Sequence, residues 1–135
     1  MGLFFVTHFI ADFIFQSRTM GKKKSENIGY LALHLLIIFL MFVGAGFAVF
    51  YQMSGNAKLS FVYAVVLSVV NATVHGLIDW NIWSLYKLSV YMRYKNDQNF
   101  DKEKYEYWND SWFYGTIGLD QLLHGLTIIV LYGWI

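Results

Sequence analysis

Four histidines and three aspartates recur inside apolar stretches of this sequence at one spacing. The histidines are His8, His34, His75 and His124. Three of them stand four residues from an aspartate, in the pairs His8 with Asp12, His75 with Asp79 and Asp120 with His124. Four residues is about one helical turn, so each pair projects from one face of a helix. Imidazole and carboxylate are ligands of zinc and related divalent ions, and both also act as general bases.

The sequence around these groups predicts an all-α integral membrane protein. Of 135 residues, 57% are hydrophobic and 14% are charged, which is too apolar for an ordinary soluble domain. Proline is absent, so no proline kink is expected in the long apolar runs. Four runs approach the length of about 20 residues that a spanning helix needs. We therefore expect a single domain over residues 1–135, a bundle of four transmembrane helices at residues 2–20, 29–51, 59–80 and 112–135.

The basic residues predict how this bundle lies in a membrane. Nine of the ten lysines and arginines follow the first run or lie between the third and fourth, and Lys58 is the exception. Because cytoplasmic loops carry the excess of basic residues, we expect a multi-pass inner-membrane protein with both termini outside. Residues 81–111 then form a cytoplasmic loop. Within it, residues 82–94 are expected to continue as an interfacial helix and residues 97–110 as a solvated loop or short helix.

In this orientation all seven groups fall in the cytoplasmic half of the membrane. At about 1.5 Å per residue, His8 lies near the middle and His124 about three turns deep. An aspartate near the centre of a spanning helix costs about 2.5–3.5 kcal/mol, so three of them need a compensating partner. The middle of a four-helix bundle is where all seven could meet.

A divalent cation is the partner that we predict, with neutral imidazoles and carboxylates as its ligands. The predicted metal ligands are His8, His34, His75, His124, Asp12, Asp79 and Asp120. The three aspartates are also the candidate catalytic bases, and His34 is the weakest candidate because no aspartate stands four residues from it. Without cysteine, zinc is the expected ion, although manganese, iron and nickel accept the same ligands. Seven groups exceed the needs of one tetrahedral zinc, which leaves open two ions or supporting roles for some ligands.

Three amides are candidates for supporting roles. Gln16 lies one turn after Asp12 and is assigned equally to the site and to the membrane interface. Gln121 points about 100 degrees away from Asp120, so an interhelical hydrogen bond is expected of it. Asn71 stands one turn before His75 and could orient that ring. The lysines at 22–24 are interpreted as the basic anchor on the inner side.

In these motifs the sequence resembles the domain of unknown function 3307 family of small bacterial and phage membrane proteins. The motifs here are HFIADFIFQ from His8 to Gln16, the histidine in LALHLLI, HGLID from His75 to Asp79, and DQLLH from Asp120 to His124. The resemblance covers nearly the whole chain and implies a four-helix membrane protein with these motif residues, but no activity. The family often has a lysine shortly after the third-helix aspartate, where this chain has Asn81.

The function that we expect is a metal-dependent hydrolase. Its substrate would be amphiphilic or lipid-linked, because a head group in the cytoplasmic leaflet reaches a site at this depth most easily. Membrane lipids are the expected partners, and an oligomer is compatible with the sequence. A net charge of +1 without a basic face predicts no nucleic-acid partner.

Two alternatives belong to other functional classes. A polar chain through a bundle could transport protons or a divalent ion, although the outward half of the bundle offers few polar groups. A non-enzymatic phage or bacterial membrane module could instead use the histidines and aspartates as a structural cluster, hydrogen-bonded across helices.

Overall fold

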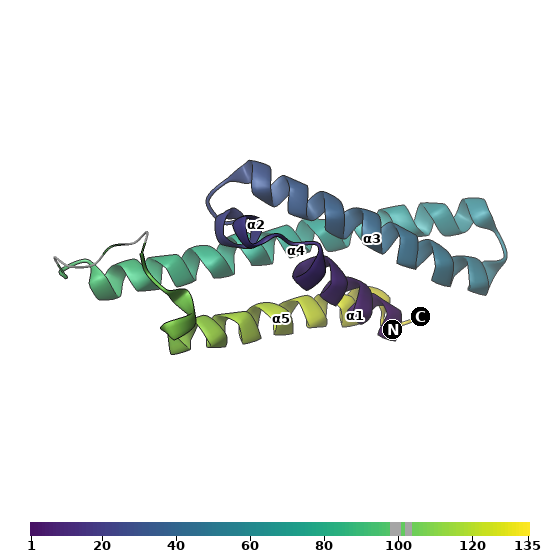
Figure 1. Cartoon of the computed structure of the whole chain (residues 1–135). Coiled ribbons are helices and arrows are strands. Elements are labelled where there is room, and N and C mark those ends of the chain that lie inside the picture. Colours follow the sequence, from purple (N-terminus) through teal and green to yellow (C-terminus); the bar gives the residue numbers. More distant parts are fainter. Residues whose placement is uncertain (98–100, 102–103) are drawn as a thin grey trace.

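The described chain is helical throughout its ordered elements. The computed structural model describes residues 1–97, 101 and 104–135, and 84% of the chain is helical. In chain order the elements are α1 (Gly2–Phe9), the π-helical turn η1 (Ile10–Ile14), α2 (Arg18–Lys23), α3 (Ile28–Ser54), α4 (Ala57–Tyr94), the 3-10 turn η2 (Tyr107–Asn109) and α5 (Ser111–Tyr132), as Figure 1 shows. The described residues include no β-strand, which confirms the predicted all-α class.

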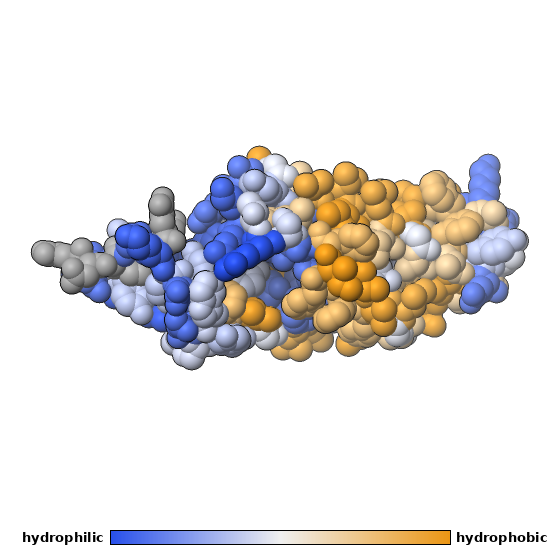
Figure 2. Space-filling model, viewed as in Figure 1, coloured by the Kyte–Doolittle hydropathy of each residue, from blue (hydrophilic) through white to orange (hydrophobic). Residues whose placement is uncertain are grey.

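Three of these helices, α3, α4 and α5, are long and apolar enough to cross a membrane. Their outward faces are apolar: Leu40 on α3 is 58% exposed and Val130 on α5 is 76% exposed. In Figure 2 a broad hydrophobic surface covers much of the molecule, and hydrophilic residues gather toward the end that Figure 1 assigns to α2 and the last turns of α4. Soluble monomers rarely expose so continuous an apolar surface, so this one indicates a membrane-embedded protein.

The third long helix extends well beyond the predicted span. α4 runs without a break for 38 residues, so residues 82–94 prolong it and do not form a separate interfacial helix. No proline or glycine follows Gly76 in this helix to stop it. At about 1.5 Å per residue α4 is about 57 Å long, nearly twice the hydrocarbon thickness of about 30 Å, so part of it lies beyond the hydrocarbon.

The first segment differs from the uninterrupted span predicted over residues 2–20. Its apolar helix ends at Ile14, where the Phe15 amide donates to the Ile10 carbonyl at 3.1 Å and closes a π-helical turn. The chain then leaves the helix and restarts as α2, whose first turn is capped by Ser17 Oγ accepting from the Met20 amide at 3.2 Å. A rise of at most about 20 Å is too short to cross the hydrocarbon alone. The predicted count of four transmembrane helices is therefore not confirmed.

The helices close a ring around one axis. α1 contacts α3 and α5, and α4 contacts the same two helices. Asn27 caps the start of α3 by accepting from the Gly29 amide at 2.9 Å, and Gly55, with φ of 64°, ends it in the left-handed region that suits glycine. The tight turn that follows makes α3 and α4 an antiparallel hairpin, and both termini of the chain lie side by side at the free ends of α1 and α5 (Figure 1).

The ring has an apolar core at the level of the termini, formed around Phe4, Ile38, Phe42, Ile128 and Tyr132. The Phe4 and Tyr132 rings stack with centroids 4.0 Å apart. Farther along the axis, Gly76 allows α3 and α4 to approach closely, since a Cβ there would lie 2.7 Å from Leu35 Cδ1. His75 precedes that glycine, so the close approach is at the level of the histidines.

Candidate metal centre

All seven predicted ligands meet in one buried cluster on the axis of the ring. α1 supplies His8, η1 supplies Asp12, α3 supplies His34, α4 supplies His75 and Asp79, and α5 supplies Asp120 and His124. None of them is more than 6% exposed. We call this set the His/Asp cluster. Whether it binds a metal stays a prediction, but the structure brings every one of the named groups together.

His34 and His75 lie at the centre of the His/Asp cluster. Their Nε2 atoms are 2.9 Å apart. His34 Nε2 is 3.3 Å from Asp12 Oδ1 and 3.3 Å from Asp79 Oδ2, and His75 Nε2 is 3.5 Å and 3.2 Å from the same two oxygens. His34 was the weakest candidate in the sequence because it has no aspartate on its own helix. Its carboxylates come from η1 and α4 instead.

His8 and His124 flank this centre. His8 Nε2 is 3.5 Å from Asp12 Oδ2, and His124 Nε2 is 3.5 Å from Asp120 Oδ1 and 3.7 Å from Asp79 Oδ1. The His75 and His124 rings stack with centroids 3.9 Å apart. All four histidines therefore turn the same ring nitrogen, Nε2, toward the carboxylates.

The spacing within the cluster is wide for hydrogen bonds and suits ligands of one ion. The seven Nε2-to-carboxylate distances run from 3.2 to 3.7 Å. A hydrogen bond from N–H to O is most often about 2.9–3.0 Å long. Ligand atoms about 2.0–2.1 Å from a tetrahedral zinc stand about 3.3 Å from one another. The measured distances are nearer to the second value, which favours a shared cation over direct pairing.

Unpaired polar atoms also gather here. The buried atoms His8 Nε2, His124 Nε2, Asp12 Oδ1 and Asp120 Oδ1 have no hydrogen-bond partner among the described residues. Leaving a buried polar group unsatisfied costs about 1–3 kcal/mol. Four such atoms facing one another would together destabilise the bundle unless another group joins them.

Three overlapping sets of residues could each hold an ion. They are His8, Asp12 and His75; His34, His75 and Asp79; and Asp12, Asp120 and His124. Within each set the ligand atoms lie within 4.8 Å of one another. Asp12 belongs to two sets, and a carboxylate can bridge two metal ions, whereas the Nε2 of His75 can serve only one. The geometry therefore accommodates one central ion or two neighbouring ions.

Lys24 is a member of the site that the sequence did not reveal. It is only 3% exposed, and its Nζ lies 2.6 Å from Asp79 Oδ1. The sequence analysis assigned it to the surface anchor with its two neighbours. The available signal was Asn81: the structure leaves Asn81 exposed, bonded to the Leu77 carbonyl at 2.7 Å, so Asp79 takes its cation from another segment.

Charge balance gives a second measure of what is missing. When ionised, the three carboxylates carry three negative charges and Lys24 returns one positive charge, while neutral histidines add none. Two negative charges then remain in a buried site, where uncompensated charge is costly. One divalent cation would neutralise them.

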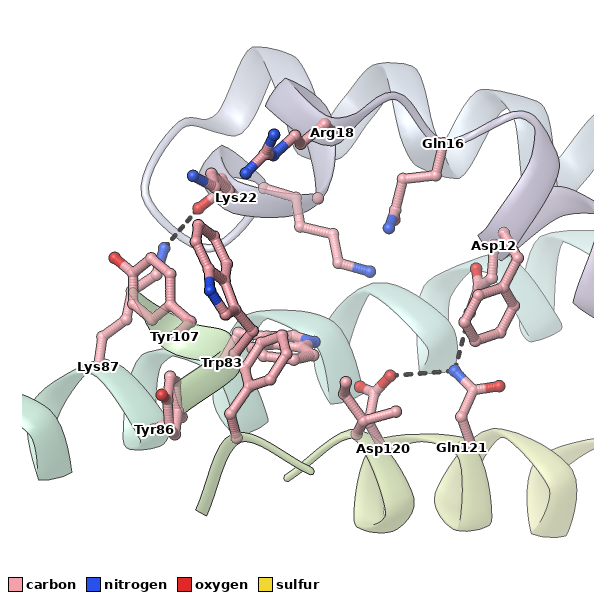
Figure 3. A pocket seen from close by; sticks show the side chains of 16 residues that line it. Asp12, Gln16, Arg18, Lys22, Trp83, Tyr86, Lys87, Tyr107, Asp120 and Gln121 are labelled. Atoms are coloured by element: carbon pink, nitrogen blue, oxygen red, sulfur yellow. Dashed lines mark hydrogen bonds between the residues drawn. The ribbon is translucent and has the colours of Figure 1, made fainter. Parts of the chain in front are cut away.

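The supporting amides have different places. Gln121 Nε2 donates to Asp12 Oδ2 at 3.2 Å and to Asp120 Oδ2 at 3.3 Å, so it joins η1 to α5 as expected of an interhelical hydrogen bond (Figure 3). Gln16 lies apart from the carboxylates, beside a cavity, and its Oε1 has no partner among the described residues. Asn71 is buried, but no hydrogen bond joins it to His75, and both residues belong to the described part of the chain.

A cavity of about 290 Å³ adjoins the His/Asp cluster. Asp12, Asp120, Gln16 and Gln121 form one wall, and Figure 3 shows Arg18, Lys22 and Lys87 on the other side. Aromatic side chains complete the lining: Phe13, Trp83, Tyr86, Tyr107, Trp108 and Phe113. The break between η1 and α2 borders this space. Non-helical backbone at membrane depth is tolerated where it lines such a cavity.

Asp110 fixes the far side of the cavity. Its carboxylate accepts from Arg93 Nη2 at 2.6 Å, Tyr105 Oη at 2.9 Å and Tyr86 Oη at 3.0 Å, and it caps α5 by accepting from the Trp112 amide at 3.0 Å. Hydrogen bonds from Arg93 hold the pKa of this carboxyl below its ordinary value. Residues 97–110 were predicted to be solvated, and Asp110 is an exception. The residues 98–100, 102 and 103 of that stretch lie outside the described residues.

Comparison with known proteins gives one match. A family model described as a protein of unknown function, DUF3307, matches residues 1–135. No curated protein and no solved structure matches the chain. That description assigns no activity, so the chemistry must be argued from the site.

Proposed function

Because the chain belongs to the DUF3307 family of proteins of unknown function, we propose its function from the site itself: an intramembrane metal-dependent hydrolase of an amphiphilic substrate. The observation that carries this proposal is the His/Asp cluster, in which seven buried ligand-type groups converge at distances of 3.2–3.7 Å. The adjoining cavity gives a substrate access to it.

Zinc is the ion that we propose, held first by the central set of His34, His75 and Asp79. A bound zinc lowers the pKa of a water ligand toward neutrality and polarises the bond to be cleaved. The outer groups His8 and His124 either complete this set or hold a second ion. Lys24 keeps Asp79 ionised and in place through its contact of 2.6 Å.

Asp12 and Asp120 are the proposed general bases because both reach the cavity. One of them takes a proton from the attacking water, whose oxygen forms the new bond to the substrate. The broken bond leaves its electron pair on the departing oxygen, which takes a proton back. Gln121 donates to both carboxylates and so holds them in one orientation.

The two alternative functions receive less support from the packing. A transport path would have to continue past Phe4, Phe42 and Tyr132, which are buried and stacked on the axis beyond the cluster. A purely structural cluster would be expected to pair its polar atoms at hydrogen-bond distances, and several of them are unpaired.

We propose the predicted orientation for the chain in an inner membrane, with the cavity and residues 81–111 on the cytoplasmic side. The hydrophilic end in Figure 2 supports this. The first segment crosses as a broken helix in this proposal. Phe4 stacks on Tyr132 at one end of it, and Lys87 Nζ donates to the Lys22 carbonyl at 2.7 Å near the other.

The experiment that tests this function is a metal analysis of protein purified in a mild detergent without chelator. We expect about one or two zinc ions per chain, and loss of most of this metal in Asp79→Asn and His75→Ala. The matched control is Asp101→Asn, which alters an exposed aspartate that pairs with Lys104. A folded wild-type protein that contains no stoichiometric divalent metal, and takes up none on dialysis, would remove the proposal.

A further inference from the structure

The cavity beside the His/Asp cluster has two chemically distinct walls. Toward the cluster it presents carboxylates and amides, and on the other side it presents the cationic groups of Arg18, Lys22, Lys24 and Lys87. Four cations around a space of about 290 Å³ are suited to an anionic group, and the phosphate group is the anion that Arg and Lys recognise most commonly.

Two of these cations are held in place and carry no carboxylate partner. The Arg18 guanidinium lies over the Trp108 ring at 5.5 Å, and Lys22 Nζ lies over the Tyr107 ring at 5.8 Å. No carboxylate in the described part of the chain pairs with Arg18 or Lys22. Their charges are therefore positioned beside the cavity and remain available to a ligand.

The size and the rim of the cavity indicate what the anion is attached to. A volume of about 290 Å³ accommodates a head group but not a pair of acyl chains. Phe13 lines the cavity and is 52% exposed, and the neighbouring Ile14 and Phe15 are 66% and 54% exposed. An apolar chain attached to the anion could lie along these side chains within the lipid.

We infer that the cavity receives the phosphate of a lipid phosphate monoester, with its apolar chain along η1 and its phosphoryl group between Arg18, Lys22 and the His/Asp cluster. This inference rests on the proposed function and names its substrate class. In the reaction a water oxygen bonds to phosphorus and the bond from phosphorus to the lipid oxygen breaks. The electron pair leaves on that oxygen, which takes a proton, so the products are the lipid alcohol and inorganic phosphate.

The test is calorimetric binding of dioctanoyl phosphatidic acid to the metal-containing protein in an uncharged detergent. Dioctanoyl glycerol and inorganic phosphate serve as separate probes. We expect phosphatidic acid to bind and dioctanoyl glycerol, which lacks the phosphate, to bind at least about tenfold more weakly. Inorganic phosphate binding as tightly as phosphatidic acid would overturn the lipid part of the inference, since it would indicate a free-anion site.

The variant that decides the role of the cationic wall is Arg18→Gln with Lys22→Gln. We expect it to lose about tenfold or more in affinity for phosphatidic acid while its metal content stays unchanged. Lys23→Gln is the matched control, because Lys23 is adjacent in sequence but lies over the Tyr30 ring, away from the cavity lining. Equal affinity in the double variant and the control would overturn the inference.

Turnover separates this inference from the proposed function. Phosphate release from phosphatidic acid should be measurable in wild type and lost in Asp12→Asn with Asp120→Asn. If the protein holds metal but neither binds nor hydrolyses phosphatidic acid, the substrate class is wrong and the metal centre stands. If it holds no metal, the proposed function itself fails.

Discussion

The two halves of the helical ring are built from the same helices but filled in opposite ways. In the half near the termini, Phe4, Phe42 and Tyr132 stack on one another within an apolar core. In the other half, the axis holds the His/Asp cluster and the adjoining cavity. The first half accounts for its own stability through packing. The second concentrates unpaired polar atoms and surplus negative charge, so its stability must depend on something that binds there.

The largest expected effect comes from removing the charge of Asp79, which is fully buried and contacts Lys24, His34 and His75. Asp79→Asn leaves the Lys24 ammonium buried without its partner, and we expect a loss of about 3–5 kcal/mol in unfolding free energy. Thermal unfolding in detergent measures it. Adding Lys24→Met to the same chain should recover part of this loss, since it removes the stranded charge. A double variant as unstable as the sum of the single ones would contradict the pairing.

Removal of the metal is expected to have the next largest effect. A ligand present at about one hundred times its dissociation constant stabilises the folded state by about 2.7 kcal/mol, so a chelator should lower the midpoint of thermal unfolding by several degrees. The same chelator should change Asp79→Asn little, because that variant holds little metal. An identical shift in both proteins would mean that the chelator acts elsewhere.

A change in the apolar half should be smaller and should leave the metal in place. Phe4→Leu keeps most of the buried volume but removes the stacking on Tyr132, and we expect a loss of about 1 kcal/mol. Metal content, measured on the folded fraction, is expected to equal that of wild type. A fall in metal content would show that the two halves are not independent.

The smallest effect concerns Asp110, which lies outside both halves of the axis. Because its folded pKa is below the ordinary aspartate value, its stabilising effect is complete above that ordinary value of about 4 and is lost as the pH falls through the lower folded pKa. Asp110→Asn should therefore be less stable than wild type near neutral pH. Thermal unfolding of both proteins from pH 7 downward should show the difference narrowing below about pH 4. A constant difference across that range would exclude the ionised carboxylate as its cause.

The parts of the site that could be predicted are those encoded within one helix. The pairs His8 with Asp12 and Asp120 with His124 stand one helical turn apart, and a helical turn alone places them on one face. The depth of each group followed from the basic loops, which is why His34 was included although its neighbours in sequence gave no reason for it. The three long helices followed from length and hydropathy.

The parts that could not be predicted depend on contacts between segments. Lys24 resembles its two lysine neighbours in sequence, and only the packing of α2 against α3 and the position of Asp79 distinguish it. The break after Ile14 has no proline and no glycine to mark it. Asp110 sits in a polar stretch, and its partners Arg93 and Tyr86 come from the extension of α4 that the predicted span of residues 59–80 did not include.

The short first segment has a consequence for the order in which the protein is assembled. Residues 2–14 leave the ribosome before every other segment, yet their helix is too short to settle across the hydrocarbon by itself. The contacts that Asp12 makes in the finished molecule are to His34, His75 and Gln121, all of which are synthesised later. We therefore expect the segment made first to be the last to reach its final place, waiting at the membrane until α5 has been inserted.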